Sequence, residues 1–481
     1  MLQTVKTIFD TFGAVVFVPV MIFIIALILR VKPSRAFISA LNAGVGLTGF
    51  TLLLNSYTPI ISKVIQKMVN DTGVNKPVFD IGWQGASLVA YSTHAGMVYL
   101  VVALILQTVL FLIHWTDVFQ PSDLWNNYSY MVWGSMCFFV TKNMWLSLAL
   151  MILLNMYSLL LSDVVAQRWS NYYGYPRCTI IALHNIEPAA FGIVMDPIWN
   201  FLRVNKIKLS PQYMQKKFGF LGEPISLGFF LGLLIGILGN FKHLGEMAAW
   251  GQTTTVAIAT AAIMVIFPKI AGIFAQAFAP LSQAASRSIR KNSKNNKDEK
   301  DKKPRLWFLG VNDAVGYGEP ATMMTGIILM PIMVALAIIL PGNKVIPIVD
   351  LLAIPYWIEG LIALSNGNMV KTMLNGVIWF SLSLYMCTAT APLFTHIASS
   401  GVGVAIPSAA LMVTSFNILG KPLFGLVFYA FLSRNPLWIG LTVIIYLVLW
   451  LLWIKNKESF RDYLERAAAK NATSQGAKVS A

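Results

Sequence analysis

The chain has 481 residues, of which 57% are hydrophobic and only 12% are charged, and its mean hydropathy is +0.66. Soluble globular domains carry about 25% charged residues, so this composition excludes a soluble protein and indicates a polytopic membrane protein. The net charge of +16 does not indicate nucleic-acid binding, because the excess Lys and Arg lie in short loops and at the chain ends, as in cytoplasmic segments of membrane proteins.

The predicted elements are long hydrophobic runs. Each approaches or exceeds the roughly 20 residues that a helix needs to cross the hydrocarbon layer of a bilayer. Helix breakers interrupt several runs, so we expect an all-α fold of about ten to twelve spans, some of them broken or re-entrant. The runs are Phe12–Leu29, Phe37–Leu54, Ala86–Ile113, Met131–Leu153, Cys178–Asn200, Gly222–Gly239, Thr255–Phe274, Ala321–Leu340, Ile346–Ala363, Leu374–Leu393, Pro407–Leu432 and Leu437–Ile454.

The first break, Gly82–Ser87, places Trp83 and Gln84 between glycines at the start of a long apolar run. Irregular backbone at membrane depth is tolerated only where protein buries it or where it lines a cavity. Gln84 offers donors and an acceptor that suit a sugar or polyol hydroxyl, or it caps a helix end. Trp83 offers a flat face for C–H stacking, or it is an interfacial aromatic residue. Both are therefore candidate substrate-binding residues.

The second break, Leu183–Pro188, contains His184, Asn185 and Glu187 within an apolar stretch. Pro188 interrupts the helix and exposes backbone groups. Glu187 can accept hydrogen bonds from two hydroxyls, and His184 can donate or accept according to its tautomer, so the trio suits a hydroxyl-rich ligand. A purely structural role for His184 is the alternative. His94, Lys142 and Asn143, which also lie in apolar stretches, are secondary candidates.

The third break is Gly222–Pro224, and the same tripeptide recurs at Gly318–Pro320. Glu223 is a secondary candidate, for the site or its gate, or else an interfacial partner of the preceding lysines. The glycines that follow it recur every fourth or third residue, which predicts a face where two helices pack closely. These glycines are Gly228, Gly232, Gly236 and Gly239.

A basic segment, residues 287–305, holds nine Lys and Arg residues against three acids. We expect it to be a flexible cytoplasmic loop that joins two related halves, about residues 1–286 and 306–454, of one membrane transport domain over residues 1–454. Many transporters consist of such repeats. An offset of 333 residues, which places Leu41-Asn42 on Leu374-Asn375, is one weak sign of internal repetition. Residues 455–481 are expected to form a charged cytoplasmic tail, helical to about Lys470.

The second half opens with Gly310–Ala314, in which Asn312 and Asp313 form either a second polyol clamp or a helix N-cap. Glu319 follows as a secondary candidate. The sequence contains no P-loop lysine motif, no nucleophile elbow and no zinc-protease motif. Its three cysteines lack metal-ligand spacing, so we expect no metal, no cofactor and no catalytic residue of its own.

Four stretches together resemble the membrane component, enzyme IIC, of the galactitol-type phosphoenolpyruvate:sugar phosphotransferase system, within the ascorbate/galactitol superfamily. The similarity extends from Phe9 to about Trp453. Three departures fall at the candidate site: Gln84 stands where proline is common, His184–Glu187 replaces His-Gly-Thr, and Val311–Ala314 replaces Gly-Leu-Asp-Pro. The four stretches are Gly82–Ser87, Gln215–Pro224, Gly310–Ala314 and Pro341–Leu351.

The resemblance implies a multi-pass permease of the bacterial plasma membrane. Such a protein carries a sugar or polyol, by default galactitol, to a phosphocysteine on a separate IIB protein, which a separate IIA protein serves. It also implies a homodimer with a fixed scaffold and a moving core, and no nucleic-acid partner. Two alternatives remain open. An ion-coupled secondary transporter would use Glu187, Asp313 and Glu319 as coupling carboxylates, and a sensor or scaffold would bind substrate without transport.

Overall fold

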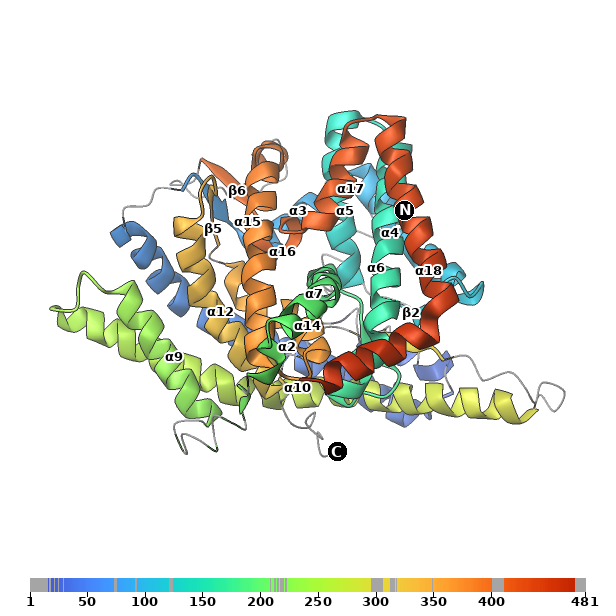
Figure 1. Ribbon diagram of the computed structural model, residues 1–481, viewed down its shortest axis with the longest axis horizontal. Helices are drawn as coiled ribbons and strands as arrows, with labels where there is room; N and C mark the ends of the chain where they lie inside the picture. Colours follow the sequence, from blue (N-terminus) through green and yellow to red (C-terminus); the bar gives the residue numbers. More distant parts are fainter. Residues whose placement is uncertain are drawn as a thin grey trace.

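The protein is seen in a computed structural model that is mostly helical (Figure 1). Five described helical segments are long and apolar enough to cross a membrane: Met144–Tyr173, Met247–Ile266, Pro320–Ile339, Met369–Ser399 and Pro436–Ala469. The chain is therefore a polytopic membrane protein. Most of the run Phe12–Leu29 lies outside the described residues. The structure describes residues 16, 19–20, 22–24, 26–28, 30–72, 76–90, 93–120, 124–207, 209–211, 213, 216, 220, 223–295, 306–311, 316, 318–347, 349–399 and 411–471.

The chain folds into many helices and short strands. The expectation that Pro188 interrupts a helix is wrong, because one helix runs over Leu183–Phe201 with Pro188 inside it. The stretch Gly82–Ser87 likewise lies within a helix, Gly82–Ala90. Pro224 and Pro320 each occupy the first turn of a helix, where proline is tolerated because the first amides have no intrahelical partner. The elements run α2 (Pro33–Thr72), β1 (Val78–Asp80), α3 (Gly82–Ala90), α4 (His94–Leu112), β2 (Val118–Phe119), α5 (Leu124–Thr141), α6 (Met144–Tyr173), β3 (Cys178–Ile180), α7 (Leu183–Phe201), η1 (Val204–Lys206), α9 (Pro224–Gly239), α10 (Met247–Asn295), β4 (Phe308–Val311), α12 (Pro320–Ile339), β5 (Val345–Ile346), η3 (Asp350–Ala353), α13 (Ile354–Trp357), α14 (Glu359–Leu364), α15 (Met369–Ser399), β6 (Met412–Thr414), α16 (Phe416–Leu419), α17 (Pro422–Leu432) and α18 (Pro436–Ala469).

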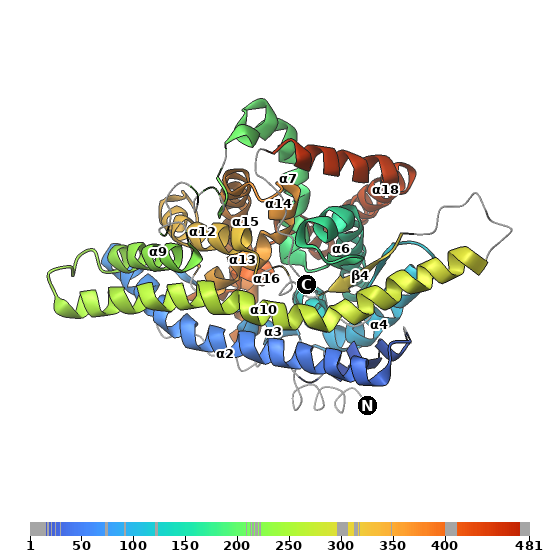
Figure 2. The same cartoon turned by 90° about the horizontal axis from the view of Figure 1, so that it is seen from below.

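Helices α2, α9 and α10 form a layer along one face of the molecule, which we call the arm (Figure 2). The predicted glycine face is confirmed. An added Cβ at Gly232 would lie 2.7 Å from the Cα of Ala257 in α10, and one at Gly236 would lie 2.7 Å from the Cα of Thr253. These contacts bring the two backbones together without side chains between them. Helix α10 extends to Asn295, so the start of the basic segment 287–305 is helical.

The other described helices surround two small parallel sheets, which the all-α expectation did not include. One sheet has the strand order β5-β1-β6 and the other β2-β4-β3. Each central strand comes from one half of the chain and both of its neighbours come from the other half. The strands are two to four residues long and lie within apolar stretches. Such short runs carry no periodicity that separates a strand from a buried helix.

The two sheets are built alike. Strands β3 and β6 are edge strands 234 residues apart, from Cys178 to Met412 and from Ile180 to Thr414. Each pairs in parallel with a central strand and is followed closely by a helix, α7 after β3 and α16 after β6. The offset of 333 residues instead aligns α2 of the arm with α15, which packs against α12, β6 and α7. The structure thus does not support the particular alignment expected from Leu41-Asn42.

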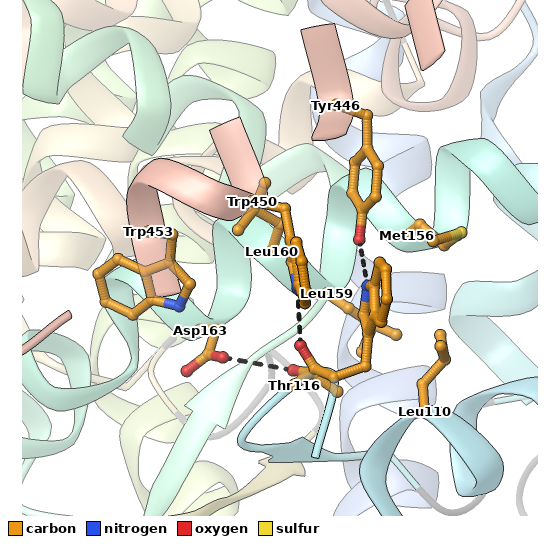
Figure 3. A pocket seen from close by; sticks show the side chains of 10 residues that line it. Leu110, Thr116, Met156, Leu159, Leu160, Asp163, Tyr446, Trp450 and Trp453 are labelled. Carbon is orange, nitrogen blue, oxygen red and sulfur yellow. Dashed lines mark hydrogen bonds between the residues drawn. The ribbon is translucent and has the colours of Figure 1, made fainter. Parts of the chain in front are cut away.

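The segment after residue 454 is the second half of α18, which turns from an upright to a nearly horizontal course (Figure 1). The upper part of α18 is held by aromatic contacts: Trp115 and Trp450 stack with ring centroids 3.8 Å apart, and Trp115 Nε1 donates to the hydroxyl of Tyr446 at 2.7 Å. Figure 3 shows Tyr446, Trp450 and Trp453 of this helix around one small pocket. The lower part of α18 is held by Arg461, which is 5% exposed and pairs with Asp163 in α6 at 3.0 Å. The expected tail therefore packs against the core up to Asn471.

Candidate functional site

Two helix junctions and one helix start come together within the described part of the protein. They are the start of α7, the junction of α13 and α14, and the junction of α16 and α17. Gly360, at the start of α14, packs so closely on α7 that an added Cβ would lie 3.0 Å from the carbonyl oxygen of Asn185. Lys421, between α16 and α17, has its Nζ 5.4 Å from the ring centroid of Trp357 at the end of α13. We call this region the central site.

Glu187 is the fully buried acid of the central site. Its Oε1 accepts a hydrogen bond from the backbone amide of Phe424 in α17 at 2.9 Å, which ties α7 to the second half of the chain. Its Oε2 is buried and has no hydrogen-bond partner within the described part of the structure. Lys421 acts on it electrostatically. A carboxylate in this position has a free acceptor for a ligand hydroxyl.

Asn185 is the second unsatisfied group. The residue is fully buried, and neither its Oδ1 nor its Nδ2 has a hydrogen-bond partner among the described residues. Burial of an unpaired amide costs about 1–3 kcal/mol, so native proteins rarely leave one without a partner. An amide provides both a donor and an acceptor, which is what a hydroxyl requires. Asn185 and Glu187 thus lie ready for a polar, hydroxyl-bearing ligand.

Two residues of the central site were missed at the sequence level: Glu359 and Lys421. Glu359 is fully buried and begins α14, and its carboxylate packs directly against Gly316, where no side chain would fit. Each is a lone charged residue in an apolar stretch, and that is the signal that could have found them, because ionisable residues at membrane depth mark function.

Trp83 lies at the start of α3, next to the β5-β1-β6 sheet, and is half-buried. Asp80 does cap this helix: its Oδ1 accepts from the amides of Gly82 and Phe416, both at 3.1 Å. His184 is buried in the first turn of α7 beside Asn185. The side chain of Gln84, and all of Asn312 and Asp313, lie outside the described residues.

The secondary candidates lie at helix ends. Asn143 caps α6, accepting from the amide of Leu146 at 3.0 Å, and Glu319 caps α12, accepting from the amide of Thr322 at 2.8 Å. Glu223 precedes α9 and is exposed, without a side-chain cap bond. His94 begins α4 and Lys142 lies in the turn before α6, and both are exposed. None of these five is placed with Asn185 and Glu187 by a described contact.

A cavity of about 920 Å³ lies elsewhere, between α6, α7, α17 and α18. Its walls are almost wholly apolar. The hydroxyls of Tyr157 and Thr442 that face it are already bonded to backbone carbonyls at 2.6 and 2.7 Å. A polyol would lose its hydrogen bonds there, so this cavity does not suit a hydroxyl-rich substrate. Among the described residues, no group of three or more His, Cys, Asp or Glu side chains could hold a metal ion.

Comparison with known proteins gives one consistent result. Residues 7–409 match the family model for the sugar-specific permease component of the PTS system, of the EIIC-GAT type. A putative permease IIC component of Escherichia coli strain K12 is 28% identical over 407 residues, which cover 84% of this chain and 89% of that protein. The galactitol-specific EIIC components of E. coli K12 and O157:H7 are 26% identical over 424 residues, covering 88% of this chain and 90% of theirs.

Proposed function

Because the chain belongs to the sugar-specific permease components of the phosphotransferase system, we propose that it binds a hexitol, by default galactitol, and carries it across the bacterial plasma membrane for phosphorylation by a separate IIB protein. The observation that carries the proposal is the unsatisfied pair Asn185 and Glu187, buried at the start of α7. Galactitol is preferred because it appears in the names of two relatives.

The chemistry of the central site supports a binding role rather than a catalytic one. Asn185 and Glu187 supply free acceptors and a donor, and Trp357 supplies an aromatic face next to Lys421. Each hydroxyl of a polyol both donates and accepts, so these groups can hold the ligand and orient one hydroxyl for the partner protein. The phosphoryl group comes from phosphocysteine on IIB, charged by IIA, so this chain forms no bond of its own.

In this proposal the membrane domain has two related halves, about residues 1–286 and 306–454, with ten to twelve spans in all. Glu187-Pro188 and Lys421-Pro422 stand at the same 234-residue spacing that relates β3 to β6. Each pair therefore follows an edge strand, although Glu187-Pro188 lies inside α7 and Lys421-Pro422 lies where α17 begins. The basic segments put residues 203–217, 287–305 and the chain end on the cytoplasmic side.

The arm provides the natural scaffold. Helices α2, α9 and α10 contact each other extensively and meet the rest of the described protein chiefly through α9 and α12. In this proposal two copies join as a homodimer through their arms, while the remaining helices move as a core that carries the central site across the membrane.

The test measures uptake and phosphorylation of labelled galactitol and other polyols by membrane vesicles that contain the chain. Reactions are run with and without its IIA and IIB partners and phosphoenolpyruvate. Sugar phosphate that forms only with the partners supports the proposal, and loss of that product in Glu187→Ala, but not in Asp462→Ala at an exposed position of α18, places the site. Accumulation of free polyol without the partners, abolished by an uncoupler, would instead establish ion-coupled transport.

A further inference from the structure

Lys421 is a buried cation of the central site. The residue is 4% exposed, and its Nζ lies 5.4 Å from the ring centroid of Trp357. Its contact is with the face of Trp357, and it acts electrostatically on Glu187 and Asp350. An ammonium group at membrane depth is costly and marks a functional position.

Glu187 is the acid of the central site that the fold relates to this charge. The two residues occupy matching positions in the chain, each directly before the proline that follows an edge strand. Glu187 also lies against the first turn of α17, which begins directly after Lys421, since its Oε1 binds the amide of Phe424. The amide of Phe424 needs only one acceptor, and a neutral side chain could supply it. Glu187 supplies a carboxylate whose second oxygen has no partner among the described residues, so we infer a role for it beyond capping.

The charges around the central site disfavour a negatively charged ligand. Glu187, Glu359 and Asp350 are buried acids there, and Lys421 is the single buried cation that the described residues place with them. A ligand carboxylate near Lys421 would displace its interaction with Glu187 and meet that carboxylate at close range. Juxtaposed like charges are strongly unfavourable in a desolvated site.

We propose that the Glu187–Lys421 pair is a specificity determinant, which makes the site accept uncharged polyols and reject sugar acids of the same length. Glu187 neutralises Lys421, and Lys421 is the group that binds a ligand carboxylate when Glu187 is made neutral. The inference rests on the proposed function, because it assigns the substrate class of the same central site. The site would reject a sugar acid because binding of its carboxylate leaves a buried charge without its partner.

The experiment measures binding of galactitol and galactonate to the purified full-length chain in detergent by isothermal titration calorimetry. The proteins are the wild type, Glu187→Gln, Lys421→Met and the double variant. The wild type should prefer galactitol, and Glu187→Gln should shift the ratio of the two affinities toward galactonate by about tenfold or more, which corresponds to about 1.4 kcal/mol. Lys421→Met should move the ratio in the opposite direction. The double variant should lose the gain in galactonate binding, because no unpaired cation remains.

The outcomes separate this inference from the proposed function. A wild type that binds galactitol, with the same ratio in all three variants, would overturn the charge-selectivity role and leave the permease function intact. A wild type that binds neither compound, in a preparation that is folded by thermal melting, would overturn galactitol as the substrate. If Glu187→Gln does not fold, the Lys421 variants provide the test. The ratio of the two affinities should change in Lys421→Met and stay at the wild-type value in Lys421→Arg, which keeps the charge. The same ratio in both variants would overturn the inference.

Discussion

The carboxylate of Asp350 binds the backbone amide of Trp83, 267 residues away in the sequence, at 2.9 Å through Oδ1. Its Oδ2 accepts from the amide of Asn417 at 2.8 Å and from the hydroxyl of Ser415 at 2.7 Å. Asp80 reciprocates by accepting from the amide of Asp350 at 2.8 Å. Two buried acids therefore hold the starts of α3, η3 and α16 where the β5-β1-β6 sheet ends.

Replacement of Asp350 by Ala is expected to lower stability by about 3 kcal/mol or more, because two backbone amides and one hydroxyl lose their shared acceptor at once. Asp350→Asn should cost less, since an amide oxygen can still accept. The three buried cysteines, Cys137, Cys178 and Cys387, give a convenient readout. A thiol-reactive dye labels them on unfolding, so melting curves in detergent report the change.

The control for this prediction is Asp462→Ala, which removes an exposed acid from α18. Its melting temperature should match the wild type. Equal melting temperatures for Asp350→Ala and Asp462→Ala would show that the carboxylate of Asp350 does not hold the three helix starts together.

Substitution of Gly232 by Leu should separate α9 from α10. The new Cβ would lie 2.7 Å from both the Cα of Ala257 and the carbonyl oxygen of Val256, and backbone atoms cannot move aside locally. Overpacking of this kind costs about 1–3 kcal/mol, and the same dye assay measures it. Gly251→Leu, in α10 with no atom within 4 Å of its Cβ position, is the matched control. Similar melting of the two variants would argue against close packing in the arm.

Much of the architecture was accessible from the sequence. Composition alone indicated a polytopic membrane protein, since charged residues are too few for a soluble surface. Each of the two Gly-Glu-Pro tripeptides stands at the start of a helix, with its glutamate as the N-cap residue and its proline as the first helical residue. Proline at the first position and an acid before it both favour a helix N-terminus. The spacing of Gly228–Gly239 correctly predicted a packing face. Of the candidate site, Asn185 and Glu187 lie together at the start of α7.

The remainder depended on contacts distant in the sequence. No local pattern indicates that Asp350 would cap a helix 267 residues away, or that β1 would lie between β5 and β6. Lys421 carries a local signal, a lone charge in a short apolar stretch, but its place beside Trp357 of α13 depends on a contact distant in the sequence. The segment after residue 454 has the composition of a solvated tail. Its docking depends on partners distant in the sequence, among them Asp163 and Asp117, which pair with Arg461, and Arg168, which pairs with Glu465.

Removal of Arg461 should release the lower part of α18. Asp163 and Asp117 are 2% and 6% exposed, and Arg461 contacts both, at 3.0 and 3.4 Å. Loss of one partner from a buried ion pair costs about 3–5 kcal/mol, because a buried charge is left uncompensated. Arg461→Met should therefore melt at a lower temperature and become sensitive to protease near Lys457. Asp163→Asn in the same chain should restore part of the lost stability.

Arg466→Met, at an exposed position of the same helix, should leave both readouts unchanged. Equal protease sensitivity of the two Arg variants would mean that the ion pair does not hold α18.

Cleavage of the chain in its basic segment tests the interleaved sheets. Every described strand pair joins residues before 296 to residues after 305: β1 with β5 and β6, and β4 with β2 and β3. Each half alone therefore leaves its strands with unpaired backbone groups, which are costly in an apolar interior.

Fragments 1–300 and 301–481, produced together, should purify as one complex through a tag on either fragment and melt close to the intact chain. Either fragment produced alone should be degraded, or should have its buried cysteines open to the dye. A solitary 1–300 fragment in which Cys137 and Cys178 stay protected would contradict the interleaved arrangement, because that fragment contains no described strand pair of its own.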